Sequence, residues 1–223
     1  MKAFSPSSML SFDLETTSVD TSTARIVTSA LVRIDASGAS PQELLADPGV
    51  EIPAEATAIH GISTEYARTH GKPHEEVLKA TIDAIQQAWA EGLGLVVYNA
   101  AYDLSVLRAL DPSFTVTGLV YDPYVIDKLK DRYRKGKRTL TDLAKHYNIK
   151  LENAHEATSD ALASARIAWM QLRAYPDLGQ MSGEELMEFQ AVGYYEQQED
   201  LKKYFAARGR EVSDINTSWP MRG

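Results

Sequence analysis

The stretch MLSFDLE, residues 9–15, decides the fold of this chain. Apolar and polar residues alternate along it, and successive side chains of a β-strand point to opposite faces of a sheet. The stretch therefore predicts a strand with one apolar face in the core and one polar face. Leu14 belongs to the core face, whereas Asp13 and Glu15 share the polar face.

The segments that follow extend this strand into a sheet. The β-rich segment 25–35 and a strand at 43–46 predict a three-strand antiparallel meander with it, and the apolar runs 93–99 and 118–123 are typical of buried strands. Apolar residues at helical spacing predict helices from Pro73 through Trp89 and at 104–110, 124–134, 139–147 and 157–174. This order indicates an α/β fold with a mixed five-stranded sheet, first antiparallel and then parallel, flanked by helices.

A segment rich in Pro, Gly, Ser and Asp, 176–183, divides the chain. Ser182 followed three residues later by Glu185 is a capping-box pattern, which predicts one helix from 182 to about 208. We therefore expect a domain of residues 1–176 and a C-terminal helical extension, 177–223, packed on or beside it and ending in an irregular tail, NTSWPMRG.

The composition, 44% hydrophobic and 24% charged residues, is that of an ordinary globular protein. The absence of cysteine excludes disulfides, thiolate metal sites and a cysteine nucleophile, and fits a reducing cytoplasm. Without a signal-peptide pattern or an apolar run of about 18 residues, we expect a cytoplasmic protein with no membrane partner. The net charge is −8, so nucleic-acid binding would require a local concentration of positive charge.

Two carboxylates on one strand face form the first candidate site. Asp13 and Glu15 repel each other unless a cation lies between them, and hard ions such as Mg²⁺ and Mn²⁺ prefer oxygen ligands. The alternative is a solvated strand edge.

A second candidate site follows the buried strand at 93–99. Asn99 lies at its carboxyl end, where sites of α/β sheets collect, and a helix begins near Tyr102 and Asp103. An ordinary turn explains Asn99 equally well, and a favourable interaction with the helix dipole explains Asp103.

A third candidate is HEATSD, residues 155–160. His155 and Asp160 can face one site only if His155 lies in the loop before the helix, where an N-cap at Thr158 or Ser159 would place it. The alternative is a surface histidine. The alanines at 161, 163, 165 and 168 allow this helix to pack closely on its neighbour.

In order and context, SFDLETT (11–17), YNAAYDLSVL (98–107) and HEATSD resemble the three exonuclease motifs of the DEDDh family. The resemblance covers residues 9–173, includes AIHGIS (58–63), and is strongest to the proofreading (epsilon) subunit of bacterial DNA polymerase III. It implies a ribonuclease H-like exonuclease fold. Two departures, Ser18 for a common Gly and Asp122-Pro123 for Asp-Thr, lie outside the expected metal ligands.

The resemblance implies two-metal hydrolysis of phosphodiester bonds from the 3′ end of single-stranded or frayed DNA, releasing nucleoside 5′-monophosphates in a proofreading or repair role. It implies two divalent ions, Mg²⁺ or Mn²⁺, and suggests a DNA polymerase as a partner. The implied metal ligands are Asp13, Glu15, Asp103 and Asp160, with His155 as the general base that completes the catalytic set. The implied substrate-binding residues are Thr16, Thr17, Ile59, His60, Ile62, Asn99 and Tyr102.

The segment KLKDRYRKGKR, 128–138, carries seven Lys or Arg residues and one Asp. Such a run suits phosphates, and Tyr133 could stack on an unpaired base, although a solvated helix end explains the run too. Two rival functions also stay open. One is an exoribonuclease of the same fold that trims RNA, and the other is a non-catalytic nucleic-acid-binding subunit.

Overall fold

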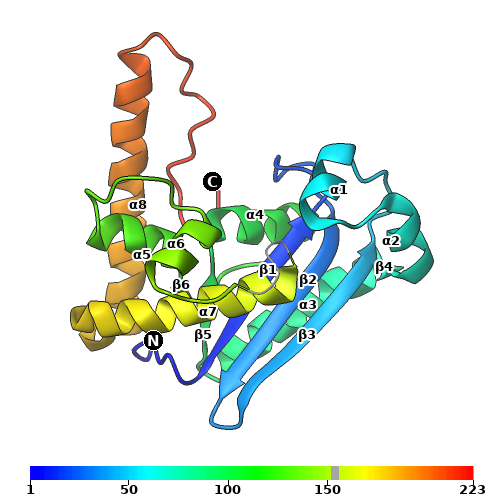
Figure 1. Cartoon of the computed structure of the whole chain (residues 1–223), viewed down its shortest axis with the longest axis horizontal. Helices are drawn as coiled ribbons and strands as arrows, with labels where there is room; N and C mark the ends of the chain where they lie inside the picture. The colour runs from blue at the N-terminus through cyan, green and yellow to red at the C-terminus, as the bar shows by residue number, and fades with distance from the viewer. Residues whose placement is uncertain (152–155, 223) are drawn as a thin grey trace.

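The computed structural model describes residues 1–151 and 156–222. Its centre is a mixed sheet with the strand order β4-β3-β2-β1-β5-β6 (Figure 1). The strands are β1 (Met9–Thr16), β2 (Ile26–Asp35), β3 (Gly38–Asp47), β4 (Lys72–Pro73), β5 (Gly94–Val97) and β6 (Val120–Tyr121). The first three strands pair antiparallel, and β5 and β6 continue the sheet in parallel. The predicted mixed sheet is confirmed, and the two-residue β4, parallel to β3, is a sixth strand beyond the expected five.

Helices cover both faces of the sheet (Figure 1). They are α1 (Ala54–His60), α2 (Thr64–His70), α3 (His74–Ala90), α4 (Ala100–Leu110), α5 (Pro123–Lys130), α6 (Leu140–His146), α7 (Ala157–Ala174) and α8 (Gly183–Ala206), with a 3₁₀ helix at Pro176–Gln180. The apolar face of β1, with Phe12 and Leu14, shares a core with Val77 and Ile85 of α3. The opposite face of the sheet receives α7.

The short helices α1 and α2 were not predicted. Gly61, at a φ of 76°, ends α1, and the Ser63 side chain caps α2 by accepting a hydrogen bond from the Tyr66 amide. Neither helix has an apolar face that the sequence could show, since α1 buries no residue and α2 buries only Ala67.

The long C-terminal helix α8 begins with the predicted capping box of Ser182 and Glu185. The tail that follows is not merely irregular: it returns to the body and ends beside α4, where Trp219 is buried in the main core (Figure 1). The division of the chain into 1–176 and 177–223 stays a prediction.

Among the helices of the described residues, none combines the length and the apolar character needed to cross a membrane.

Candidate active site

Strand β1 presents two carboxylates on one face. Leu14 is buried in the core, while Asp13 and Glu15 are half-buried on the opposite face, as the alternation predicts. The pairing of β1 with β2 shifts register between Glu15 and Thr16, where the strand ends.

Helix α7 brings a third carboxylate to this face. The cap residue is Glu156, not Thr158 or Ser159 as expected; Thr158 hydrogen-bonds to Glu43 instead. Small residues allow a close approach, since Ala157 and Ala161 pack against Ala30 and Val32 of β2. Asp160, in the first turn of α7, is thereby brought over β1.

A side chain that the sequence did not single out fixes this contact. Ser11 lies on the same face of β1 as Asp13, and its Oγ donates to the carbonyl oxygen of Ala161 at 2.7 Å. The bond joins β1 to α7 directly beside Asp160. The alternation of apolar and polar residues in β1 was the sequence signal for this contact, because it makes Ser11 a buried polar side chain that needs a hydrogen-bond partner.

Three carboxylates meet in one place. One oxygen from each of Asp13, Glu15 and Asp160 can be chosen so that all lie within 4.8 Å of one another. Burial, followed by the negative charges of Asp103, Glu15 and Asp160, raises the pKa of Asp13 well above its usual value. Burial, followed by Asp160 and Glu43, raises the pKa of Glu15 to about 7. Crowded oxygen ligands that repel one another fit a hard divalent cation, which relieves the repulsion.

Helix α4 adds the fourth carboxylate. Asp103 is buried, and its Oδ1 accepts a hydrogen bond from the backbone N–H of Leu14 at 3.2 Å. Burial is the main cause that raises its pKa. A cleft of about 420 Å³ contains Asp103 together with Asp13 and Asp160. Asn99 and Tyr102 line the same cleft.

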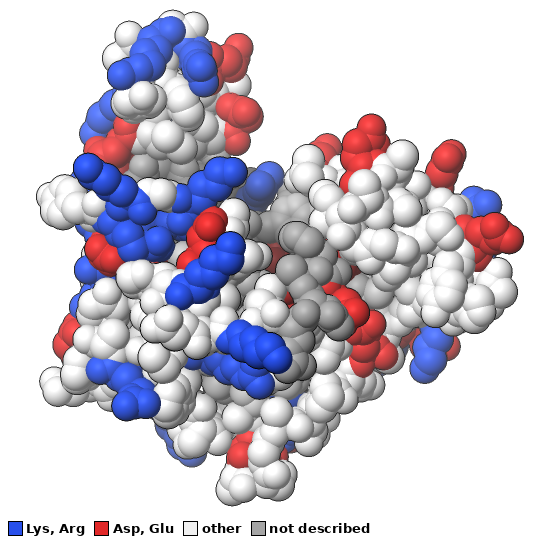
Figure 2. Space-filling view, viewed as in Figure 1, with Lys and Arg blue, Asp and Glu red and all other residues white. Residues whose placement is uncertain are grey.

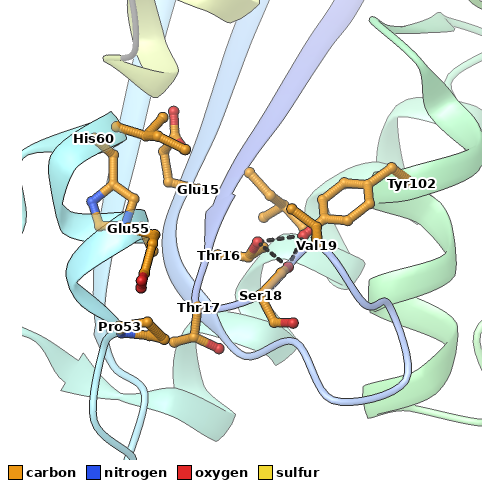
Figure 3. Close-up of a pocket in the computed structure, with 12 residues that line it drawn as sticks. Glu15, Thr16, Thr17, Ser18, Val19, Pro53, Glu55, His60 and Tyr102 are labelled. Atoms are coloured by element: carbon orange, nitrogen blue, oxygen red, sulfur yellow. Dashed lines mark hydrogen bonds between the residues drawn. The ribbon is translucent and has the colours of Figure 1, made fainter.

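A second cavity, of about 400 Å³, adjoins the cluster at Glu15. Figure 3 shows its walls: Glu55 and His60 of α1 face Tyr102 of α4 across it. Among the residues expected to bind substrate, Thr16, Thr17, Ile59, His60 and Tyr102 line it. The Tyr102 hydroxyl hydrogen-bonds with Thr16 and with the Ser18 carbonyl, which ties α4 to the end of β1.

Ile62 does not line this cavity. It packs instead with Val27, Ile52 and Ala67 beneath the two short helices, because the turn at Gly61 directs the chain back toward the sheet. His60 contacts the turn as well, since its Nδ1 accepts from the Ile62 amide at 3.2 Å. Burial lowers the pKa of His60, which favours a neutral ring.

The basic run is mostly occupied by ion pairs. Arg134 and Arg138 both pair with the fully buried Asp127. Lys130 pairs with Asp177, and Arg132 with Asp200 at 3.3 Å. Arg134 and Arg138, both partly buried, hold the segment in shape through these pairs, and Arg138 also lines the cleft that contains Asp13, Asp103 and Asp160. That the cations of this run serve phosphates stays a prediction. Lys135 and Lys137 are exposed, and Figure 2 shows Lys and Arg gathered over α5, the segment after it and α8.

His155, the expected general base, lies outside the described residues.

The fold and the acidic cluster define one class of protein, the exonucleases, and the family model for that class (RNase_T, exonuclease) matches residues 10–168. The chain belongs to the DEDDh 3′–5′ exonuclease superfamily, as its three motifs predict.

The curated relatives are polymerases. The chain is 31% identical over 163 residues to the PolC-type DNA polymerase III of Clostridium perfringens and 30% identical over 173 residues to that of Streptococcus suis. The matches cover 70% and 73% of this chain but 10% and 11% of the relatives, so the chain spans about a tenth of their length. These relatives are of the PolC type, whereas the motifs alone suggested the epsilon subunit.

Solved structures share the fold. Exonuclease I of E. coli in complex with a dA16 oligonucleotide superposes with a TM-score of 0.62 at 20% identity, over 78% of this chain and 42% of that one. Exonuclease X in complex with 5′ overhanging duplex DNA gives a TM-score of 0.60 at 18% identity, over 82% of this chain and 99% of that one. At these identities the likeness shows the fold alone, and it confirms the predicted fold.

Proposed function

We propose that this protein is a metal-dependent 3′–5′ exonuclease that removes nucleoside 5′-monophosphates from single-stranded or frayed DNA ends. One observation carries the proposal: one carboxylate oxygen from each of Asp13, Glu15 and Asp160 lies within 4.8 Å of the other two, and Glu15 also lines a cavity of about 400 Å³. The first feature suits cations that bind phosphate, and the second suits the nucleotide at a chain end.

The carboxylates fit divalent cations by their chemistry, because the cluster offers oxygen ligands whose pKa values rise through burial and mutual repulsion. Asp13, Glu15 and Asp160 would hold one ion, and Asp13 with Asp103 would hold the second. Mg²⁺ or Mn²⁺ bound there supplies a water of lowered pKa and neutralises charge at the scissile phosphate. Asp103 also anchors α4 to β1 through the Leu14 amide.

Proton transfer is assigned to His155 on the strength of the HEATSD motif. An imidazole titrates near neutrality and suits the removal of a proton from an attacking water. The role is the family's expected one, and its test is a variant described in the Discussion.

The cavity at Glu15 would receive the terminal nucleotide. Val19, Ile59 and Tyr102 give it apolar walls, against which a base can pack, while Thr16 and Thr17 give it hydroxyl groups. The exposed Lys135 and Lys137 would attract the phosphates of the strand behind it. DNA is favoured over RNA because the relatives are DNA polymerases.

The similarity to these DNA polymerases also supports a proofreading or repair role. The matched relatives carry this region as about a tenth of a PolC-type DNA polymerase III, so a DNA polymerase is the partner that we propose.

The experiment uses DNA and RNA strands of one sequence, each labelled at the 3′ or the 5′ end, with Mg²⁺, with Mn²⁺ or with EDTA. We expect early release of the 3′ label as a mononucleotide, gradual shortening of 5′-labelled strands, and faster action on DNA. Faster action on RNA would favour the exoribonuclease alternative. Strand binding without any cleavage would favour a non-catalytic subunit, and early release of the 5′ label would contradict the proposal.

A further inference from the structure

The C-terminal tail is bound to the helix that carries Asp103. After α8 the chain returns to the body, and Trp219, only 8% exposed, enters the main core beside Tyr194. The backbone N–H of Arg222 donates to Ser105 Oγ on α4 at 2.7 Å. The tail lies beyond residue 168, where the family match ends.

Asp122 receives the tail. Its carboxylate is buried, and Oδ2 accepts from the indole N–H of Trp219 at 3.2 Å and from the Ala100 amide at 2.9 Å. Oδ1 accepts from the Asn99 amide at 2.9 Å. Gln190 of α8 completes the arrangement, since its Oε1 accepts from the Asp122 amide at 2.7 Å. One carboxylate therefore connects the tail with the first residues of α4.

The start of helix α4 depends on a hydrogen-bond acceptor outside the helix, the Asp122 carboxylate. Its cap residue, Asn99, has a left-handed backbone with a φ of 61° and makes no side-chain cap bond. The first amides of a helix need acceptors, and Asp122 supplies them from another part of the chain. The helix that starts there carries Tyr102, which lines both cavities, and Asp103, which bonds to β1.

We propose that Trp219 is a positioning residue for the exonuclease site: its indole N–H orients the Asp122 carboxylate, Asp122 fixes the start of α4, and α4 carries Asp103 and Tyr102 to the cluster. The inference rests on the proposed function for its effect on turnover, but the structural coupling is measurable without it. The tail acts on the site through its bonds to Asp122 and to Ser105 of α4.

Trp219→Phe is the sharpest variant, because it keeps an aromatic ring in the core and removes only the indole N–H that donates to Asp122. Trp169→Phe is the matched control: Trp169 lies exposed on α7, with Arg173 stacked over its ring. The first readout is amide hydrogen exchange in metal-free protein. In Trp219→Phe we expect exchange over residues 99–104 to rise about 10-fold, roughly the effect of removing one buried hydrogen bond, with β2 and β3 unchanged.

The second readout is the kinetics of 3′-end hydrolysis at a temperature where both variants are folded. We expect kcat of Trp219→Phe to fall about 10-fold, as for other residues that orient metal ligands, while KM stays within about 2-fold and Trp169→Phe matches the wild type. Asp122→Asn, which removes one of the two acceptor oxygens, should show the same pattern more strongly.

Unchanged exchange over residues 99–104 in Trp219→Phe would overturn the coupling. A faster exchange with an unchanged kcat would overturn the positioning role and leave Trp219 as a core residue only. If the wild type cleaves no strand, the proposed function fails, but the exchange measurement still decides the coupling.

Discussion

The Oγ atom of Ser11 lies 2.7 Å from the carbonyl oxygen of Ala161 and donates a hydrogen bond to it. The bond crosses from β1 to α7, between two residues that are 150 positions apart in the chain. Because Asp13 follows Ser11 on the same face of β1 and Asp160 precedes Ala161 on α7, this bond sets how closely the two carboxylates approach each other.

Ser11→Ala should therefore weaken metal binding as well as the fold. We expect a loss of about 1–2 kcal/mol in the free energy of unfolding, the usual effect of one buried hydrogen bond. We also expect Mn²⁺ affinity, measured by calorimetric titration, to fall about 10-fold, as it does when residues that orient metal ligands are removed.

Ser29→Ala is the control, since Ser29 Oγ accepts a buried hydrogen bond from Thr81 at 2.7 Å, away from α7. This variant should lose about as much free energy of unfolding as Ser11→Ala, and its Mn²⁺ affinity should be unchanged. Equal losses of Mn²⁺ affinity in both variants would show that the Ser11 bond has no specific effect on the site.

The raised pKa of Glu15, about 7, predicts a pH dependence for the metal-free protein. A carboxyl group whose pKa is higher in the folded state stabilises that state fully at low pH and loses this contribution as the pH rises toward 7. The melting temperature in EDTA should thus fall from pH 5 to pH 8, and this fall should be smaller in Glu15→Gln than in the wild type. Mn²⁺ affinity should rise over the same range, because the ion competes with protons. A Mn²⁺ affinity that falls toward pH 8 would contradict the assignment.

His155→Ala should lower turnover by about 10²–10⁴-fold, the usual contribution of a general base. Binding of Mn²⁺ and of single-stranded DNA should change little, since neither depends on proton transfer. Full activity at neutral pH would remove His155 from the mechanism.

The cations of the basic run are of two kinds: those held in ion pairs, and the exposed Lys135 and Lys137. Lys135→Ala with Lys137→Ala should weaken binding of all single-stranded sequences alike. The slope of log affinity against log salt should fall by about 0.7 for each phosphate that a lysine no longer neutralises. An unchanged salt slope would exclude these two lysines from the interface.

Arg134→Ala, in contrast, should act on the fold. Removing one partner of the buried Asp127 leaves that carboxylate with Arg138 alone, and we expect a loss of about 1–3 kcal/mol in the free energy of unfolding. Thermal denaturation measures this loss, and an unchanged melting temperature would show that the pair contributes nothing.

Local pattern predicted much of the fold. The alternation of apolar and polar residues in β1 and the helical repeat of apolar residues in α3 and α7 predicted these elements to within a few residues of their observed bounds. Helices α1 and α2 were not predicted, because Gly61 sets the end of α1 and Ser63 the start of α2, and neither helix shows an apolar repeat.

The sequence motifs predicted the carboxylates of the site. The contacts that position these carboxylates depend on tertiary packing and could not be predicted. Nothing in the sequence near Asp122 indicates that its carboxylate accepts from the amides at the start of α4, or that Trp219 from the far end of the chain donates to it, since both contacts depend on tertiary structure. The same holds for the ion pairs that Arg134 and Arg138 form with the buried Asp127, which the run of basic residues does not reveal.

The central claim is that the Asp13, Glu15 and Asp160 cluster is the metal-dependent exonuclease centre. Its most direct test is the initial rate of 3′-terminal nucleotide release from single-stranded DNA by wild type, Asp13→Asn and Asp83→Asn, in Mg²⁺ and in EDTA. Asp83 is the matched control, because it is an exposed carboxylate of α3 that pairs with Lys79, away from the cluster. We predict activity in Mg²⁺ alone, a loss of more than about 100-fold in Asp13→Asn, since even indirect changes at metal sites cost about 10–100-fold, and a near-normal rate in Asp83→Asn. Release of the 3′ nucleotide that persists in EDTA, or in Asp13→Asn at the wild-type rate, would contradict the account.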